Sequence, residues 1–246
     1  MTTPAPGGPL RPGAFAQLQP SWAGAYGPAS VRLDGVKVSV SGQGVPVSPT
    51  ELVPLTFGIR QAVGSHVEAS ADIGWVDSGI GLRFGVPFFE STPLVLAAGL
   101  RTGAVSVVRP DTYEGSLSLE AYPDLSRARD GSLRLVLAVG VSSGAFWHQL
   151  WLPSQYHSDS DAPTGAPLLE IVRPETRLQT SLGLYFQREH ASVVVALSPW
   201  FLLSSRDPTS AICDTCDSSH VVTDFSQSWG VALIIAPSWG KDLGRP

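Results

Sequence analysis

A histidine and a serine two positions apart, His190 and Ser192, are the residues of this chain whose types come nearest to nucleophilic catalysis. Residues two apart in a β-strand project from the same face, so these side chains could meet as base and nucleophile, with Glu189 as an acidic neighbour. Acyl-transfer chemistry also needs an orienting group and an oxyanion site in one geometry, and no third group in the sequence converges on the pair. We therefore expect no enzymatic activity.

Two cysteines, Cys213 and Cys216, form a solitary CxxC motif in a polar segment. A zinc site would need further ligands at matching spacing, and thiol redox catalysis would need a helix N-terminus beside a βαβ pattern. Neither accompanies the motif, so we expect a structural disulfide formed in an oxidising compartment. Histidines and aspartates in two polar segments could bind a divalent cation between loops; they are His148, His157, Asp159, Asp161, Asp217 and His220. Polar loops commonly carry such residues, so we expect neither a metal nor another cofactor.

Charged residues alternate with apolar ones along much of the chain. In Gly79–Val86, the apolar Ile80, Leu82 and Phe84 alternate with glycines and Arg83. Successive side chains of a strand point to opposite faces, so this pattern predicts a strand with one apolar face and one polar face. The pattern recurs about ten times. On its polar faces lie the charged residues Arg60, Glu68, Asp72, Arg83, Arg101, Glu114, Glu120, Arg134 and Arg177.

The composition indicates where so many half-polar strands could be accommodated. Of the 246 residues, 43% are hydrophobic and only 15% are charged, against about 25% charged in an average soluble protein. The mean hydropathy is +0.13, yet no run of about 18 apolar residues predicts a transmembrane helix. In a β-barrel that spans a membrane, apolar side chains face lipid and polar ones face the lumen. A soluble β-sandwich, whose strands can show the same alternation, is the alternative.

We predict an all-β, up-and-down antiparallel transmembrane β-barrel of about ten strands, with about eight as the alternative. The expected strands are 31–41, 52–62, 65–76, 79–88, 93–102, 112–122, 131–143, 175–188, 191–203 and 221–236. Residues 1–30 are expected to be a flexible Pro/Gly-rich N-terminal segment, although 14–19 could pair as a short strand, and 31–246 to be the barrel domain. Connections alternate between short turns and longer loops, with one tight exception at 77–78, and 144–174 is the longest loop. Short turns are typical of the periplasmic side of such barrels.

The charged residues on the polar faces would lie inside the barrel. Buried charge is costly unless it is paired, and a barrel of about eight strands is just wide enough for side chains to fill. We therefore expect an ion-pair network that fills and stiffens the lumen. A narrow pore lined by the same charges is the alternative, because the many inward Gly, Ala and Ser residues leave room.

With these strands, the chain resembles a bacterial outer-membrane β-barrel protein. The segment 228–235 is similar to the C-terminal signal that the barrel-assembly machinery recognises, with Ser228 as the polar residue, Gly230 as the glycine, and Leu233 and Ile235 as the hydrophobic positions. It departs from the common form because its last hydrophobic residues are aliphatic and further residues follow. The resemblance implies an outer-membrane location, contact with outer-membrane lipids and the assembly machinery, and protein partners in the envelope. Met1–Pro20 shows no export signal.

The function that we expect is non-enzymatic: a membrane scaffold or partner-binding component of an envelope complex, such as a surface or motility machine. A small channel for solutes is the alternative. A lipid-modifying hydrolase is third, because the His190–Ser192 spacing is similar to that of one outer-membrane deacylase family. Nucleic acid is not an expected partner, since the net charge is −5 and no basic cluster is present.

Overall fold

The computed structural model describes β-structure and its short connections, and no helix occurs among the described residues. It also contains, within those residues, no helix long and apolar enough to cross a membrane. The described ranges are 8–10, 15–26, 30–33, 36–39, 56–64, 66–74, 78–86, 92–103, 112–126, 132–151, 168–188, 190–207, 210–213 and 222–242.

The strands differ in length around the molecule. β5 to β8 have 8 or 9 residues, whereas β9 has 19 and β10 has 21. In chain order the strands are β1 (Phe15–Tyr26), β2 (Ser30–Leu33), β3 (Val36–Ser39), β4 (Thr56–Ala62), β5 (Val67–Gly74), β6 (Ser78–Val86), β7 (Leu94–Thr102), β8 (Tyr113–Ala121), β9 (Leu133–Trp151), β10 (Leu168–Arg188), β11 (Ala191–Ser205), β12 (Ser210–Cys213), β13 (Val222–Ser226) and β14 (Trp229–Asp242).

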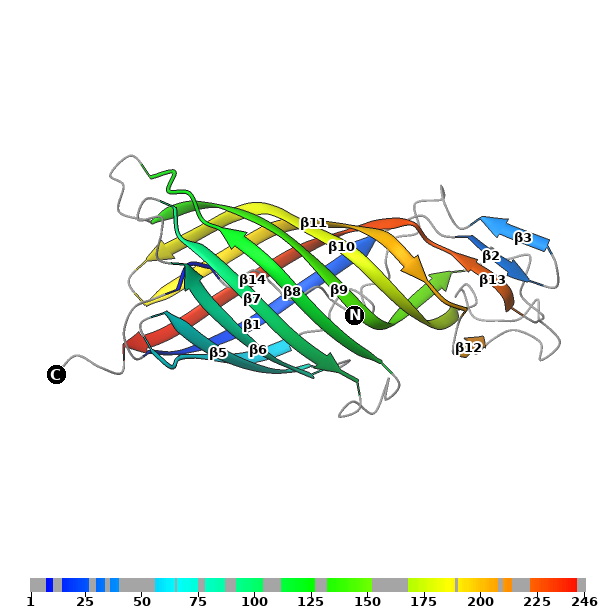
Figure 1. Ribbon diagram of the computed structural model, residues 1–246, viewed down its shortest axis with the longest axis horizontal. Coiled ribbons are helices and arrows are strands. Elements are labelled where there is room, and N and C mark those ends of the chain that lie inside the picture. The colour runs from blue at the N-terminus through cyan, green and yellow to red at the C-terminus, as the bar shows by residue number, and fades with distance from the viewer. Residues whose placement is uncertain are drawn as a thin grey trace, which may run out of the picture.

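The main sheet closes on itself (Figure 1). β1 pairs with β4, and from β4 to β11 each strand pairs with the next one in the chain. β11 then pairs with β14, and β14 pairs with β1, which closes the ring. β12 pairs with β10 and stands outside the ring. Of the eleven strands in this sheet, all but β12 therefore form a ring, in which every pairing is antiparallel. A closed ring leaves no unpaired strand edge. The predicted all-β, up-and-down antiparallel barrel is confirmed.

The barrel surface is apolar and its interior is polar. Side chains such as Ile80 and Leu100 are each 62% exposed on the outside. Their charged neighbours on the other face are buried: Glu68 is 2% exposed and Arg83 is 6% exposed. A soluble β-sandwich would bury the apolar face. The inverted arrangement is the one that a hydrocarbon surrounding stabilises.

We call the end of the barrel at which β4 meets β5 the turn side, and the opposite end the loop side. At the turn side β6 also meets β7, β8 meets β9 and β10 meets β11, and β1 begins beside the end of β14. The three-stranded sheet β13-β2-β3 lies at the loop side (Figure 1). The predicted alternation of short and long connections does not hold throughout, because β5 and β6 are only three residues apart at the loop side whereas eleven residues separate β8 from β9 at the turn side.

The N-terminal part of the prediction is wrong. Phe15–Tyr26 is the barrel strand β1, whereas the expected strand 31–41 is replaced by the short strands β2 and β3, which pair with each other outside the ring. The barrel therefore begins well before residue 31, and the described part of 1–30 is not a flexible segment. Pro20 argues against a central strand because it lacks an N–H, yet it pairs with Phe57 within β1 and β4.

The expected long loop 144–174 and the expected end of the last strand are also wrong. β9 and β10 stay paired from the barrel out to Trp151 and Leu168, so only 152–167 separates them. The predicted strand 221–236 is two strands, β13 and β14, and β14 continues to Asp242. The paired extensions 146–151 of β9 and 168–173 of β10 rise beyond the start of β8, and we call them the loop-side wall.

At Gly144 the backbones of β8 and β9 approach so closely that a side chain has no room, which a substitution can test. A Cβ placed there would lie 2.0 Å from the Tyr113 backbone oxygen, whereas one on the neighbouring Gly115 would meet nothing nearer than Leu100 at 3.6 Å. We expect Gly144→Ala to destabilise the barrel by about 1–3 kcal/mol, because the clash is with backbone. Gly115→Ala is the matched control and should leave stability unchanged. Chemical denaturation in detergent measures both, and equal midpoints for the two variants would contradict the prediction.

Candidate functional site

The turn-side cluster is a buried polar group formed by Arg60, Glu68, Arg83, Glu120 and Tyr122. Arg60 Nε donates to Glu68 Oε1 at 2.7 Å, and Arg83 Nη1 donates to the same oxygen at 3.1 Å. Arg83 Nη2 also donates to Glu120 Oε2 at 2.5 Å. The Tyr122 hydroxyl donates to that oxygen at 2.6 Å. Two arginines and two carboxylates thus neutralise one another inside the barrel.

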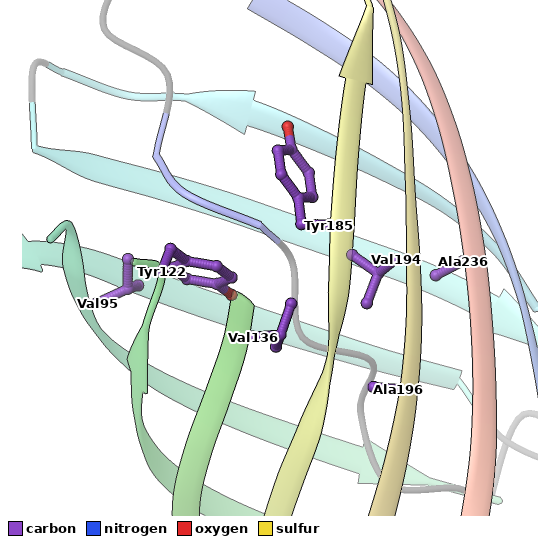
Figure 2. Close-up of a cluster of buried hydrophobic side chains, with 7 residues drawn as sticks. All are labelled: Val95, Tyr122, Val136, Tyr185, Val194, Ala196 and Ala236. Atoms are coloured by element: carbon purple, nitrogen blue, oxygen red, sulfur yellow. The ribbon is translucent and has the colours of Figure 1, made fainter. Parts of the chain in front are cut away.

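An N-terminal segment enters this cluster. Arg83 Nη2 donates to the Gly8 carbonyl oxygen at 2.5 Å, although 75 residues separate the two. Beside them lies an apolar collar, in which Leu10 packs against buried side chains from β7, β9, β10, β11, β14 and the end of β8 (Figure 2). The collar consists of Val95, Tyr122, Val136, Tyr185, Val194, Ala196 and Ala236. The turn-side end of the interior is therefore occupied by both polar and apolar contacts.

Smaller polar groups lie between the two ends of the barrel. Arg101 binds Asp72 through two hydrogen bonds, of 2.7 Å and 3.2 Å. Gln179 Nε2 donates to Ser142 Oγ at 2.7 Å and lies 3.5 Å from Glu114 Oε1. These contacts cross from one strand to another, so they hold the wall of the barrel together.

The loop-side cluster is a second buried group, formed by His148, Arg173, Glu175, Arg177 and Gln227. Glu175 is its centre: Oε1 accepts from Arg173 Nε and Oε2 accepts from Arg177 Nε, each at 2.6 Å. His148 Nε2 lies 2.9 Å from Glu175 Oε1, and its Nδ1 lies 2.7 Å from Gln227 Oε1. The Glu175 side chain has no exposed surface.

This cluster joins the loop-side wall to the strand β13. Arg173 Nη1 donates to the Phe225 carbonyl oxygen at 2.7 Å, and its guanidinium lies 4.5 Å from the Phe225 ring centre. The Arg177 guanidinium lies between two rings, 3.8 Å from Phe146 and 4.1 Å from Trp200. Cation–π contacts of this kind are stronger when water is excluded.

Glu175 lies past the apolar band of its own strand. The outward pair Val141 and Leu178 is apolar, whereas the next outward pair towards the loops is Ser143 and Thr176, whose hydroxyls are 3.0 Å apart.

Burial alone would raise the pKa of the Glu175 carboxyl, but the His148 hydrogen bond and the nearby arginine charges lower the pKa to about 2. The carboxylate is therefore ionised throughout the ordinary pH range.

The structure brings most of the predicted lumen residues into contact. Arg60, Glu68, Arg83 and Glu120 share one cluster, and Arg101 and Asp72 form a pair. The others have different surroundings: Arg177 binds Glu175, Glu114 lies near Gln179, and the half-buried Arg134 donates to the Tyr122 carbonyl oxygen at 3.1 Å. A role for this network in function stays a prediction.

Two members of the loop-side cluster were not predicted: Arg173 falls in the segment 144–174 that was expected to be a loop, and Glu175 begins the expected strand 175–188 but was not counted among the lumen charges. The alternation Arg173, Glu175, Arg177 is the signal that could have found them, since residues two apart share a face of a strand. Gly8 was also not predicted, since its contact with Arg83 leaves no local pattern in the sequence.

The residues considered for catalysis and metal binding are placed as follows. His190 lies exposed at the β10–β11 turn, whereas Ser192 is buried with its Oγ 2.6 Å from Ser238 Oγ. Within the described ranges, no group of three or more His, Cys, Asp or Glu side chains could hold a metal ion. Of the cysteines, Cys213 ends β12 and only its backbone is described, so the disulfide stays a prediction. Outside the described residues lie Cys216, His157, Asp159, Asp161, Glu189, Asp217 and His220.

The residues of the expected assembly signal open the last strand instead of closing it. Ser228 precedes β14, and Gly230 is buried against the Trp200 ring. Leu233 and Ile235 are each 36% exposed on the outer face. Recognition by the assembly machinery stays a prediction.

A closed antiparallel ring with lipid-compatible side chains outside and neutralised charges inside satisfies the requirements for crossing a membrane with strands. The chain is a transmembrane β-barrel. Its apolar band faces the lipids, and its two buried clusters lie towards opposite ends of the barrel.

Solved structures of outer-membrane proteins are similar to this barrel along nearly its whole length, at low identity. The outer membrane protease OmpT from Escherichia coli is 8% identical with a TM-score of 0.43, and the match covers 94% of this chain and 97% of that one. The outer membrane protein OprG from Pseudomonas aeruginosa is 16% identical with a TM-score of 0.35, covering 94% and 97%. Neisserial surface protein A is 8% identical with a TM-score of 0.34, covering 92% and 96%. No protein-family model and no curated protein matches the chain. At these similarities, the barrel fold rests on the chain's own strand pairing and surface.

Proposed function

We propose that this barrel is a non-enzymatic membrane platform whose loop-side wall binds another protein of the cell envelope. The observation that carries the proposal is the rigid wall itself. β9 and β10 continue as a paired extension beyond β8, and β12 pairs with the outer part of β10. A long ordered wall above the bilayer presents a fixed surface, which costs a partner little ordering entropy on binding.

The loop-side cluster supports the same proposal because it stiffens the wall. Arg173 binds Glu175 on its own strand and the Phe225 carbonyl oxygen of β13, so this side chain ties the wall to the neighbouring strand. Burying ionic groups gives little net stability, but it fixes a single arrangement of the elements that carry them. A wall held in one arrangement loses little conformational entropy when a partner protein binds to it.

A small channel is the second candidate. The observation that favours it is a belt of small inward residues that are neighbours in the strand register: Ser70, Gly81, Gly99 and Ser116. All four are only half-buried, so side chains do not fill the interior beside them. Against an open channel, the turn-side end is occupied by the turn-side cluster and the Leu10 contacts.

Site-specific photo-crosslinking in intact cells tests the platform. We expect a crosslinker placed at Arg206, which is exposed just past β11 on the loop side, to give a discrete protein adduct. A crosslinker at Leu100, which is 62% exposed on the lipid-facing surface, is the matched control and should give none. The absence of any adduct at Arg206, or the same adducts at both positions, would remove the platform proposal.

A further inference from the structure

We propose that Gly8–Leu10 is a removable plug that closes the turn-side end of the lumen, and that its displacement lets small inorganic ions pass through the barrel. The inference goes beyond the platform function, which needs only the loop-side wall. It gives the barrel a second, gated activity that the resting structure holds closed.

The plug is fixed first by its backbone. Gly8 is buried with φ +78°, a left-handed conformation that residues with a Cβ rarely adopt. Its carbonyl oxygen accepts a hydrogen bond from Arg83 Nη2 at 2.5 Å, a donor that also serves Glu120. A hydrogen bond to a charged donor is stronger than a neutral one. The segment is therefore held by a charge that the barrel keeps in place through two carboxylates.

The plug is fixed next by shape. A Cβ on Gly8 would lie 2.4 Å from Tyr185 Cε2, so the Tyr185 ring covers the glycine without leaving space for a side chain. The Tyr122 and Tyr185 rings meet edge to face, with centroids 6.4 Å apart. The Tyr185 ring thus forms the surface against which this glycine fits, and the Tyr122 ring supports it.

Leu10 closes the apolar collar. It packs against the buried collar residues, and a Cβ on Gly85 would lie 2.9 Å from Leu10 Cδ1. The collar side chains come from five strands and the end of β8 and gather in one region (Figure 2). A hydrophobic constriction of this kind blocks ions because it cannot replace their hydration shell. Leu10 in contact with the collar adds to this apolar barrier.

The path beyond the plug is lined by small residues. The half-buried belt of Ser70, Gly81, Gly99 and Ser116 crosses β5 to β8 towards the loop side of the plug. The loop-side cluster draws its members from β9, β10 and the end of β13, on one side of the ring. The wall of β5 to β8, which adjoins β9 in the ring, carries the small residues of the proposed route.

Single-channel recording in planar bilayers containing potassium chloride tests the proposal with the full-length chain. Wild-type barrels should be silent, whereas Gly8→Val, which clashes with Tyr185, should show discrete conductance steps. Gly64→Val is the matched control: Gly64 lies exposed in the β4–β5 turn, and a Cβ there meets nothing within 4 Å. It should stay silent. Heat-modifiable migration on gels establishes that each variant is a folded barrel.

A second pair of variants tests whether Gly8–Leu10 plugs the lumen if Gly8→Val does not fold. Leu10→Glu places a charge against the apolar collar and should also release the plug, because burying an unpaired carboxylate is costly. Leu125→Glu is its control, since Leu125 is 48% exposed beyond the end of β8. Folded but silent Gly8→Val or Leu10→Glu barrels would overturn the plug and leave the platform standing. Conductance steps in the wild type equal to those of the variants would overturn the plug and favour the open channel.

Discussion

Replacing Glu175 by Gln is expected to destabilise the barrel by about 3–5 kcal/mol, because one partner of a buried ionic group is removed while the others remain. The Glu175 carboxylate binds Arg173 and Arg177 at once and has no exposed surface. Without its charge, two guanidinium groups face each other beside His148. The same change removes the centre of the cluster that joins the wall to β13, so the loop-side wall should also become sensitive to protease.

The free energy of unfolding, followed by tryptophan fluorescence in lipid vesicles with increasing denaturant, measures this effect. Asp207→Asn is the matched control, because Asp207 is an exposed carboxylate just past the end of β11. It should leave the unfolding free energy and the protease pattern unchanged. If Glu175→Gln behaves as this control does, then the loop-side cluster contributes nothing to the wall.

The pH dependence of the same cluster follows from the lowered pKa of Glu175. The carboxyl has a pKa of about 2 in the folded barrel, against an ordinary value of 4.5. Between these values the unfolded chain binds more protons than the folded one, so this contribution is complete above 4.5 and is lost as the pH falls towards 2. We expect the wild type to lose more stability than Glu175→Gln over this window. Parallel acid titrations of the two proteins would contradict the assignment.

The alternation of apolar and polar residues predicted the barrel because it is a local property of each strand inside the bilayer. It failed where the surroundings change. At Ser143 and Thr176 the outward side chains become polar, so the contrast between the faces disappears although β9 and β10 remain paired. β1 was foreseen only as a short strand over 14–19, because its apolar pattern is weak, whereas pairing on both sides holds the whole strand in place.

The charged residues of the interior were predictable, but their partners were not. Arg83 on β6 reaches Glu120 on β8 across the intervening strand, a contact that depends on the curvature and stagger of the closed barrel. Glu68 and Arg83, by contrast, are direct neighbours in the register of β5 and β6, which the strand pattern does imply. The contact of Gly8 with Arg83 needs the fold of the whole chain, because a segment outside the sheet enters the barrel.

At the turn side, Glu68→Gln is expected to cost about 3–5 kcal/mol, since Glu68 Oε1 binds both Arg60 and Arg83 and the side chain is 2% exposed. Arg83 keeps Glu120, so most of the loss should come from Arg60, whose charge is then left without this carboxylate. Adding Arg60→Met to Glu68→Gln should therefore restore much of the stability, because an apolar side chain replaces a buried charge that has lost this carboxylate. Asp72→Asn is the control for removing a carboxylate near the rim, and it should cost less because the Asp72 side chain is 24% exposed. Denaturant unfolding of the wild type and these three variants measures the losses, and a double variant no more stable than Glu68→Gln would show that the loss does not arise at Arg60.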